Sequence, residues 1–215
     1  MKKLLIATVA TLALGAMVGP AMAQATLAPA EWTSNGNTIN DNSTITSTTT
    51  AESGGGTGRI VLTASNGATV ACHLQVTTSD NSWVGDAGTD QIGVSDLMFS
   101  DCVSNLCPGV TASNNNTISS QLVYDTSTLD VFDQLSNISF TDSVPCVGSL
   151  TFTGSLKTVA THDANACGGI GGVILEFVNS VTGGTLSGPG GLTARAAGFQ
   201  EVCLDDGTDL DVEIP

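Results

Sequence analysis

The sequence predicts an all-β fold, an antiparallel β-sandwich or barrel-like structure braced by disulfides. Three observations support this: β-rich segments recur at regular spacing, turn-forming clusters separate them, and six cysteines follow an export signal. Short strands divided by Gly, Asn, Asp and Ser clusters are typical of sandwiches and closed antiparallel sheets. An even number of cysteines in an exported chain indicates a disulfide framework.

The chain begins with a secretory signal, which we place at residues 1–23. Lys2 and Lys3 precede an apolar run, and Ala21-Met22-Ala23 fits the small-residue rule for cleavage. The run is short for a bilayer span, and no second apolar run long enough to cross a bilayer follows it. We therefore expect a secreted protein, extracellular, at the cell surface or in the periplasm, with no membrane span.

The charge of the chain excludes one class of partner. Removal of Lys2 and Lys3 with the signal leaves three basic residues against twenty acidic ones, a formal net charge of −17. Such a surface repels nucleic-acid phosphates and anionic lipid headgroups. We expect no nucleic-acid partner and no polybasic membrane contact.

Two regions follow the signal. Residues 24–58 are rich in Thr, Ser and Gly, which predicts an N-terminal arm or edge strand with a hinge at the Gly54-Gly55-Gly56 run. Residues 59–215 are predicted to form a single all-β domain with an acidic C-terminal tail.

The first predicted element of that domain is a hairpin over residues 59–78. Asn66-Gly67 stands between two β-rich arms and tolerates the positive φ angles of a type I′ turn. In the second arm the residues alternate, which predicts that Cys72 faces the core and His73 faces solvent. Its predicted inward face consists of Val70, Cys72, Leu74 and Val76.

The remaining elements follow in order along the chain. Between the predicted strands at residues 117–125 and 137–142, "STLDVFDQLSN" predicts a short helical turn, because Ser127 and Asp130 resemble a capping box. Leu129, Phe132 and Leu135 at spacing three support that turn. Further strands are predicted at residues 91–100, 117–125, 137–142, 147–160, 172–179 and 193–204.

All six cysteines are predicted to form three disulfides. A zinc site favours closer Cys pairs backed by histidines, whereas Cys102 and Cys107 are separated by four residues and His73 and His162 stand alone. A bridge from Cys72 to Cys102 closes a loop of about thirty residues and contributes about 3 to 4 kcal/mol. We prefer it to a Cys102–Cys107 bridge, which contributes about 2 kcal/mol, because Cys72 is predicted to face the core and Cys72 and Cys102 both belong to strands or strand ends. The six candidates are Cys72, Cys102, Cys107, Cys146, Cys167 and Cys203.

No complete catalytic motif is present in the sequence. His162 and Asp163 are adjacent, and side chains next to each other on extended chain point apart, so they do not form a triad. We therefore expect no catalytic residues, no cofactor-binding residues, no cofactor and no metal ligands. A hydrolase acting on carbohydrate or lipid through a carboxylate pair stays open, because twenty acidic residues permit pairs that sequence does not show.

Two features are candidates for contacts with partners. Trp83, in the predicted loop "DNSWVGDAG", is a candidate exposed contact. The tail "LDDGTDLDVEIP" is a candidate for a weak calcium contact, although it departs from the EF-hand pattern.

The order of "TVACHLQV", "LMFSDC" and "PCVGSLTFTGSL" after a Thr- and Asn-rich start resembles a family of small secreted bacterial β-rich proteins named for an activator of alkane oxidation. The likeness covers about residues 27–160. The resemblance implies a non-enzymatic accessory protein associated with a surface or matrix, and it supplies no catalytic residues. We expect an exported surface, matrix or accessory binding protein whose partner is a cell-surface or matrix component. The alternative of a self-assembling structural subunit, held together by self-association, stays open.

Overall fold

The computed structural model describes residues 27–39, 43–50, 58–78, 92–180 and 182–214. Most of these residues lie in antiparallel strands, so the predicted all-β fold is confirmed. The described helical segments are short, namely α1 (Ala166–Gly169) and the 3-10 turn η1 (Pro189–Gly191). The strands are β1 (Leu27–Pro29), β2 (Glu31–Ser34), β3 (Asn37–Thr38), β4 (Ile45–Thr50), β5 (Ile60–Ala64), β6 (Thr69–Thr78), β7 (Ile92–Ser104), β8 (Thr111–Asn114), β9 (Ile118–Asp125), β10 (Val131–Val144), β11 (Gly148–Asp163), β12 (Gly172–Phe177), β13 (Gly184–Ser187), β14 (Thr193–Leu204) and β15 (Asp211–Glu213).

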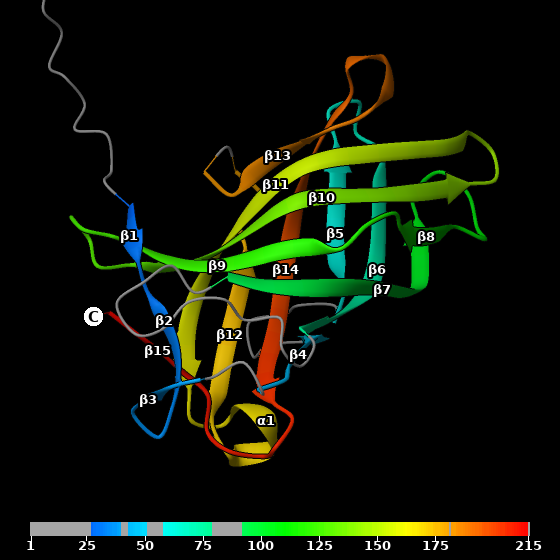
Figure 1. Cartoon of the computed structure of the whole chain (residues 1–215). Helices are drawn as coiled ribbons and strands as arrows, with labels where there is room; N and C mark the ends of the chain where they lie inside the picture. The colour runs from blue at the N-terminus through cyan, green and yellow to red at the C-terminus, as the bar shows by residue number, and fades with distance from the viewer. Residues whose placement is uncertain (1–26, 40–42, 51–57, 79–91, 181, 215) are drawn as a thin grey trace, which may run out of the picture.

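The main sheet closes into a near-complete ring, which corresponds to the barrel-like alternative (Figure 1). Its order is β9, β7, β6, β4, β14, β12, β11 and β10, and β10 pairs with β9 again. At three positions in the ring, two successive strands lie end to end and pair with the same neighbour or neighbours. β4 and β5 both pair with β14 and β6, β12 and β13 both pair with β11 and β14, and β8 and β9 both pair with β10. Among the described strands β8 is hydrogen-bonded to β10 alone; it lies beside β7 without pairing with it, so the hydrogen-bonded ring is incomplete there.

Gly198 marks the point where β14 changes partner from β4 to β5. Phe199 pairs with Thr50 of β4, and Ala197 pairs with β5. Gly198 has φ +138°, and a Cβ there would lie 2.7 Å from the Arg59 carbonyl oxygen. Only glycine combines that backbone angle with that close approach. The partner change around the ring therefore depends on this residue.

Strict alternation of side chains fills the interior of the ring. Along β6 the residues from Val70 to Thr78 alternate between half-buried and buried, and Cys72 points inward while His73 points outward, as predicted. The aromatic ring of Phe140 lies between those of Phe99 and Phe152, at centroid distances of 5.5 and 5.8 Å. Buried aromatic and aliphatic side chains of this size each contribute about 1.5 to 3 kcal/mol. They are the main source of stability inside the ring.

A small second sheet, which we call the cap, packs against one end of the ring. It consists of β15, β2 and β3 and so joins the two ends of the chain. Trp32 of β2 and Leu210, just before β15, are fully buried against strand ends of the ring. The nearby β4 belongs to the segment in which an arm or edge strand was expected, and it is hydrogen-bonded to β6 and to β14.

The disulfides join segments that the ring brings side by side. Cys72 of β6 is bonded to Cys102 of β7, which confirms the preferred pairing. The other bridges are Cys107–Cys146 and Cys167–Cys203. Each bridge spans 30 to 39 residues, a length for which the chain-entropy model gives about 3 to 4 kcal/mol. Three disulfides indicate an oxidising, extracytoplasmic location.

The predicted helical turn at residues 127–137 is wrong. Residues 126–128 form a turn, and β10 begins at Val131. Val131, Asp133 and Leu135 all point inward with a period of two. Because Asp133, one of these inward residues, is acidic, the alternation of buried and outward positions cannot be recognised from the sequence.

The hairpin at residues 59–78 is confirmed, but its turn is not type I′. Only Gly67 in this loop has a positive φ, of +85°, whereas a type I′ turn needs two such residues. The Gly67 amide donates to the Ala64 carbonyl, and the Ala68 amide donates to the Asn66 side chain. The result is a three-residue loop in which glycine takes the left-handed position.

Candidate functional site

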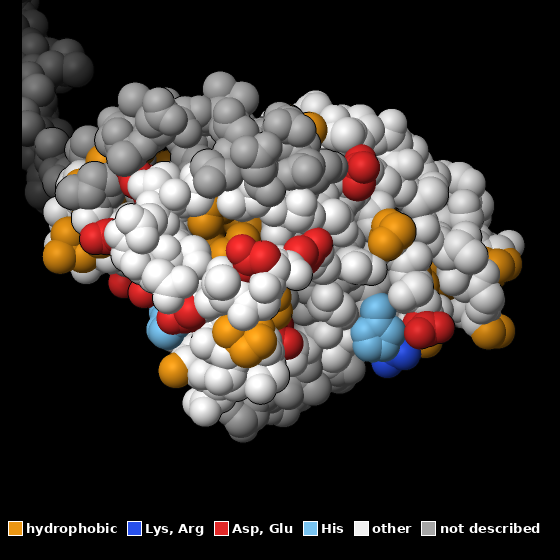
Figure 2. Space-filling model, turned by 60° about the horizontal axis from the view of Figure 1, so that its bottom comes forward, with side chains coloured by type: hydrophobic (Ala, Val, Ile, Leu, Met, Phe, Trp, Pro, Cys, Tyr) orange, Lys and Arg blue, Asp and Glu red, His pale blue; other side chains and the backbone are white. Residues whose placement is uncertain are grey.

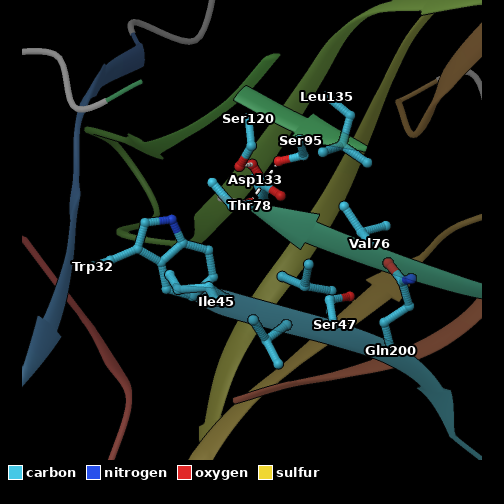
Figure 3. A pocket seen from close by; sticks show the side chains of 12 residues that line it. Trp32, Ile45, Ser47, Val76, Thr78, Ser95, Ser120, Asp133, Leu135 and Gln200 are labelled. Atoms are coloured by element: carbon cyan, nitrogen blue, oxygen red, sulfur yellow. Dashed lines mark hydrogen bonds between the residues drawn. The ribbon is translucent and has the colours of Figure 1, made fainter. Parts of the chain in front are cut away.

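A group of polar side chains lies inside the ring, and we call it the interior polar cluster (Figure 3). Each member comes from a different strand and is at most 5 % exposed. Among them, Thr78 and Ser95 share a hydroxyl–hydroxyl hydrogen bond of 2.5 Å, and the Gln200 amide donates to the Leu74 carbonyl at 3.4 Å. The cluster consists of Ser47, Thr78, Ser95, Ser120, Asp133, Thr158 and Gln200.

Asp133 is the ionisable member of the cluster. The Ser120 hydroxyl donates to its Oδ1 at 2.8 Å. Burial raises the pKa of Asp133 to about 7, although the hydrogen bonds from Ser120 and from the Gln121 amide act in the opposite direction. The carboxyl group is therefore largely protonated in mildly acidic solution.

The cavity beside this cluster is too small for an organic ligand. Its volume is about 20 Å³, room for roughly one water molecule. A second, apolar cavity in the ring measures about 40 Å³. In the described part of the chain the Ser47 hydroxyl, which lines the first cavity, has no hydrogen-bond partner. The interior of this ring is thus filled by its own side chains, as expected for a closed sheet of about eight strands.

A second buried carboxyl group lies elsewhere in the ring. Asp142 is 2 % exposed, and its Oδ1 has no hydrogen-bond partner within the described residues. Its neighbours include Val70, Leu106 and Phe152 around a cavity of about 30 Å³. Burial raises the pKa of Asp142 to about 7. Asp133 and Asp142 line different cavities, so they lend no support to a carboxylate pair.

The two histidines and two partly exposed acids, Asp125 and Asp163, make local structural contacts. His73 Nδ1 lies 3.2 Å from the Thr49 hydroxyl. Asp125 accepts hydrogen bonds from the Ser127 hydroxyl and amide, which hold its pKa below the usual range. Asp163 accepts a hydrogen bond from the Asn165 amide. The contacts of Asp125 and Asp163 are turn contacts with residues two positions away.

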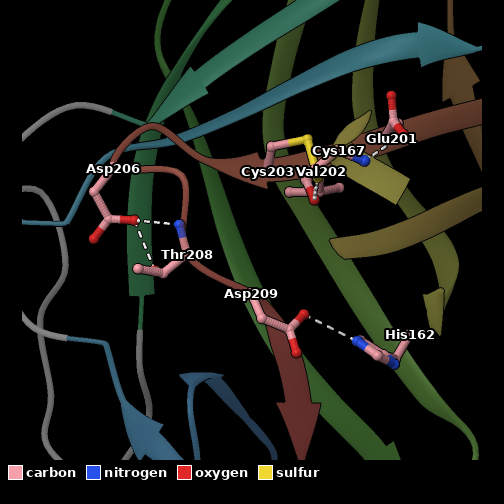
Figure 4. The surroundings of a disulfide bond; sticks show 8 residues. All are labelled: His162, Cys167, Glu201, Val202, Cys203, Asp206, Thr208 and Asp209. Atoms are coloured by element: carbon pink, nitrogen blue, oxygen red, sulfur yellow. Dashed lines mark hydrogen bonds and ion pairs between the residues drawn. A yellow bond between two sulfur atoms is a disulfide. The ribbon is translucent and has the colours of Figure 1, made fainter. Parts of the chain in front are cut away.

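His162 anchors the acidic tail to the ring (Figure 4). Its Nε2 lies 3.1 Å from Asp209 Oδ1. This hydrogen bond, with the charges of Asp211 and Asp163, raises the pKa of His162 although partial burial lowers it. A Cβ on Gly171 would lie 2.0 Å from Asp209 Oδ1, so glycine is required where the tail crosses. The tail is therefore a packed part of the fold.

The acidic side chains of the tail point to separate partners. Asp206 accepts hydrogen bonds from the Thr208 amide and hydroxyl, and Asp211 accepts one from the Val212 amide. Within the described ranges no group of three His, Cys, Asp or Glu residues is placed to hold a metal ion. Figure 2 likewise shows acidic side chains scattered over one face, with little basic surface among them.

The larger hollow lies on the outside of the ring, and we call it the outer groove. It measures about 210 Å³ and lies over β9, β10, β11 and the start of β13. Its lining is about half polar, with two carboxamides, two hydroxyls and one ammonium group. The lining residues are Gln121, Gln134, Leu135, Ser136, Ser155, Leu156, Lys157 and Gly184.

A β-bulge in β10 lies beside the groove. Leu135 pairs with Leu156 and Ile138 pairs with Gly154, so two residues of β10 stand opposite Ser155 alone. Asn137, inside the bulge, has φ +58°. Its side chain donates to the Thr117 carbonyl at 3.1 Å, which fixes the bulge in place. Bulges of this kind re-aim side chains next to functional sites.

Strand register places the polar groups of the groove in a row. Gln121 pairs with Gln134, and Gln134 pairs with Lys157. Lys157 Nζ lies 3.5 Å from the centroid of the Phe132 ring, a cation–π contact. Desolvation lowers the pKa of Lys157, and the charges of Asp125 and Asp130 counteract it. The aromatic ring and the ammonium group thus form one side of the row.

Apart from Lys157, the polar side chains of the groove make no hydrogen bond within the described part of the chain. Among the described residues, none is hydrogen-bonded to the side chains of Gln121, Gln134, Ser136 or Ser155. A carboxamide offers two donors and one acceptor, and a hydroxyl offers both functions. As far as the described residues show, the groove therefore presents unpaired hydrogen-bonding groups on strands whose register is fixed.

The sequence singled out none of the groove residues as a site. They come from four strands and meet only through register, so no local motif marks them. Trp83, the candidate exposed contact, lies outside the described residues, as does the predicted signal at residues 1–23. Asp142 could have been found by extending the alternation of Ile138 and Phe140 by one step.

Comparison with protein-family models, with curated proteins and with solved structures gave no match. In the described ranges no helix has the length and apolar character needed to cross a membrane.

Proposed function

We propose that this protein is an exported, non-enzymatic binding protein that attaches to a cell-surface or matrix component through the outer groove. The observation that carries the proposal is the row of Gln121, Gln134 and Lys157, in which the two glutamine carboxamides have no hydrogen-bond partner among the described residues. The small volume of the interior cavities supports it, because a ligand has room only outside the ring. The disulfides and the export signal agree with work in an oxidising compartment.

The two alternatives gain less support. A hydrolase with a carboxylate pair would need two acids at one cleft, whereas Asp133 and Asp142 line separate cavities. Self-assembly would use the open edge of β7. Exposed Asp96 and a bulge at Asp101, with φ +48°, lie on that strand. Charges and bulges are features that discourage edge-to-edge pairing.

The proposal predicts that binding depends on the groove carboxamides. The mature protein is mixed with cell-envelope and matrix material from the producing cells, and the sedimented fraction is measured against material concentration. We expect the double variant Gln121→Ala, Gln134→Ala to bind about tenfold more weakly, because two hydrogen bonds of about 0.5 to 1.5 kcal/mol each are lost.

Gln75→Ala is the matched control, because Gln75 is half-buried on β6, outside the groove lining. It should bind as the unmodified protein does. Equal binding by the groove double variant and the Gln75 variant would contradict the proposal.

A further inference from the structure

We infer that the outer groove takes a neutral, hydroxyl-rich ligand, a hexose unit of a polysaccharide, and rejects charged sugars. The inference rests on the proposed function and names the ligand class for the same groove. It follows from the charge, the hydrogen-bonding groups and the size of the groove.

Charge disfavours ligands of either sign. The mature chain carries a net charge of −17, since three basic residues stand against twenty acidic ones, and such a surface repels polyanions such as sulfated or uronate-rich chains. Lys157 is the charged residue of the groove lining, and Asp125 and Asp130, which favour its charged form, lie outside that lining. An amino sugar is disfavoured in turn, because its ammonium group would meet that of Lys157. A neutral ligand avoids both penalties.

The hydrogen-bonding groups match sugar hydroxyls. Each hydroxyl of a hexose donates and accepts, and so do the carboxamides of Gln121 and Gln134 and the hydroxyls of Ser136 and Ser155. Lys157 adds donors only. Leu135 and Leu156 also line the groove, but their side chains are buried in the core of the ring, so the groove contacts a ligand mainly through its polar groups.

The size of the groove fits a small unit. Its volume of about 210 Å³ is below the roughly 300 to 1,000 Å³ of pockets that enclose drug-sized ligands. One ring can lie in it while the polymer continues on either side. Affinity for a single unit should be weak, and several protein molecules on one polymer would raise the apparent affinity.

Affinity electrophoresis of the mature protein tests the inference with matched polymers. The neutral probes are dextran, amylose and mannan, and the charged probes are dextran sulfate and diethylaminoethyl-dextran. We expect at least one neutral polymer to retard the protein at physiological ionic strength. Gln134→Ala should weaken that retardation at least about fivefold, and Gln75→Ala should not change it.

Replacing Lys157 tests whether binding requires a positive charge or only hydrogen bonds. Lys157→Met should weaken neutral-polymer binding only a few-fold, since one donor among several is lost. Binding of dextran sulfate that is abolished by Lys157→Met and Gln134→Ala would overturn the inference in favour of an anionic ligand. Binding of the cationic polymer that Gln134→Ala abolishes would overturn it as well.

The outcomes distinguish this inference from the proposed function. If no neutral polymer binds while matrix material still binds through Gln121 and Gln134, the ligand class is wrong and the groove stands. If matrix binding does not depend on those residues, the groove itself is wrong. Thermal unfolding of each variant checks that the fold is retained, which we expect because these side chains make no described hydrogen bonds.

Discussion

Replacing Asp133 and Asp142 by asparagine should raise stability at pH 8 and remove most of the pH dependence of stability between about pH 4 and 7. Both carboxyl groups are buried, and burial raises the pKa of each from 3.8 to about 7. The folded protein therefore holds two protons that the unfolded chain releases near pH 4. The free energy of unfolding that these two bound protons contribute is fully present below about pH 4 and is lost as pH rises to about 7.

The expected size is large for single substitutions. A shift of about three pKa units corresponds to an upper limit of roughly 4 kcal/mol for each group. Asparagine keeps the shape of the side chain and an oxygen that can accept from the Ser120 hydroxyl, as Asp133 does now. Each single variant should remove about half of the dependence of the free energy of unfolding on pH.

Other titrating groups can be separated from this effect. His162, whose pKa is raised, also makes stability fall as pH rises, but from about pH 6.5 upward. Asp125 and Asp206 have lowered pKa values and act below pH 4. Asp96→Asn, at an exposed position on β7, is the matched control and should leave the slope unchanged. Urea unfolding from pH 4 to 8 measures it, and an unchanged slope in the double variant would refute buried, protonated carboxyls.

Leu210→Ala should lower the free energy of unfolding by about 2 to 5 kcal/mol. Leu210 is 0 % exposed and lies in the acidic tail, where it packs with Trp32 and the strand ends of the ring. Truncation leaves a cavity under the cap, in which β15 pairs with β2. The measurement is urea unfolding at fixed pH.

Leu129→Ala supplies the control with the same chemical change. Leu129 is 60 % exposed, so its truncation should alter stability by no more than about 0.5 kcal/mol. Equal, small effects of the two substitutions would mean that the tail does not pack on the ring.

The strands could be predicted because most of them keep a period of two. Residues 59–78, 117–125 and 193–204 were placed within a few positions of β5 with β6, β9 and β14. The prediction failed where β10 begins, since Asp133 occupies an inward position. The bulge at residues 136–137 then puts Leu135 and Ile138 inward at spacing three. Because of both features, the sequence pattern of this strand resembles that of a helical turn.

The candidate site was harder to foresee, for physical reasons. Gln121, Gln134 and Lys157 lie far apart in the sequence and become neighbours only through register. Each alone reads as an ordinary outward residue of a strand. The Cys72–Cys102 bridge was predicted from the inward direction of Cys72. The other two bridges depend on how the ring closes, which local sequence does not reveal.

The most direct test of a binding site on the outer groove is backbone hydrogen exchange of the mature protein, free and bound to matrix material. The account predicts slower exchange in residues 118–121, 134–138 and 153–157, which surround the groove. It predicts no change at the cap or along the open edge of β7. Protection confined to the cap or to β7, with none around the groove, would contradict it.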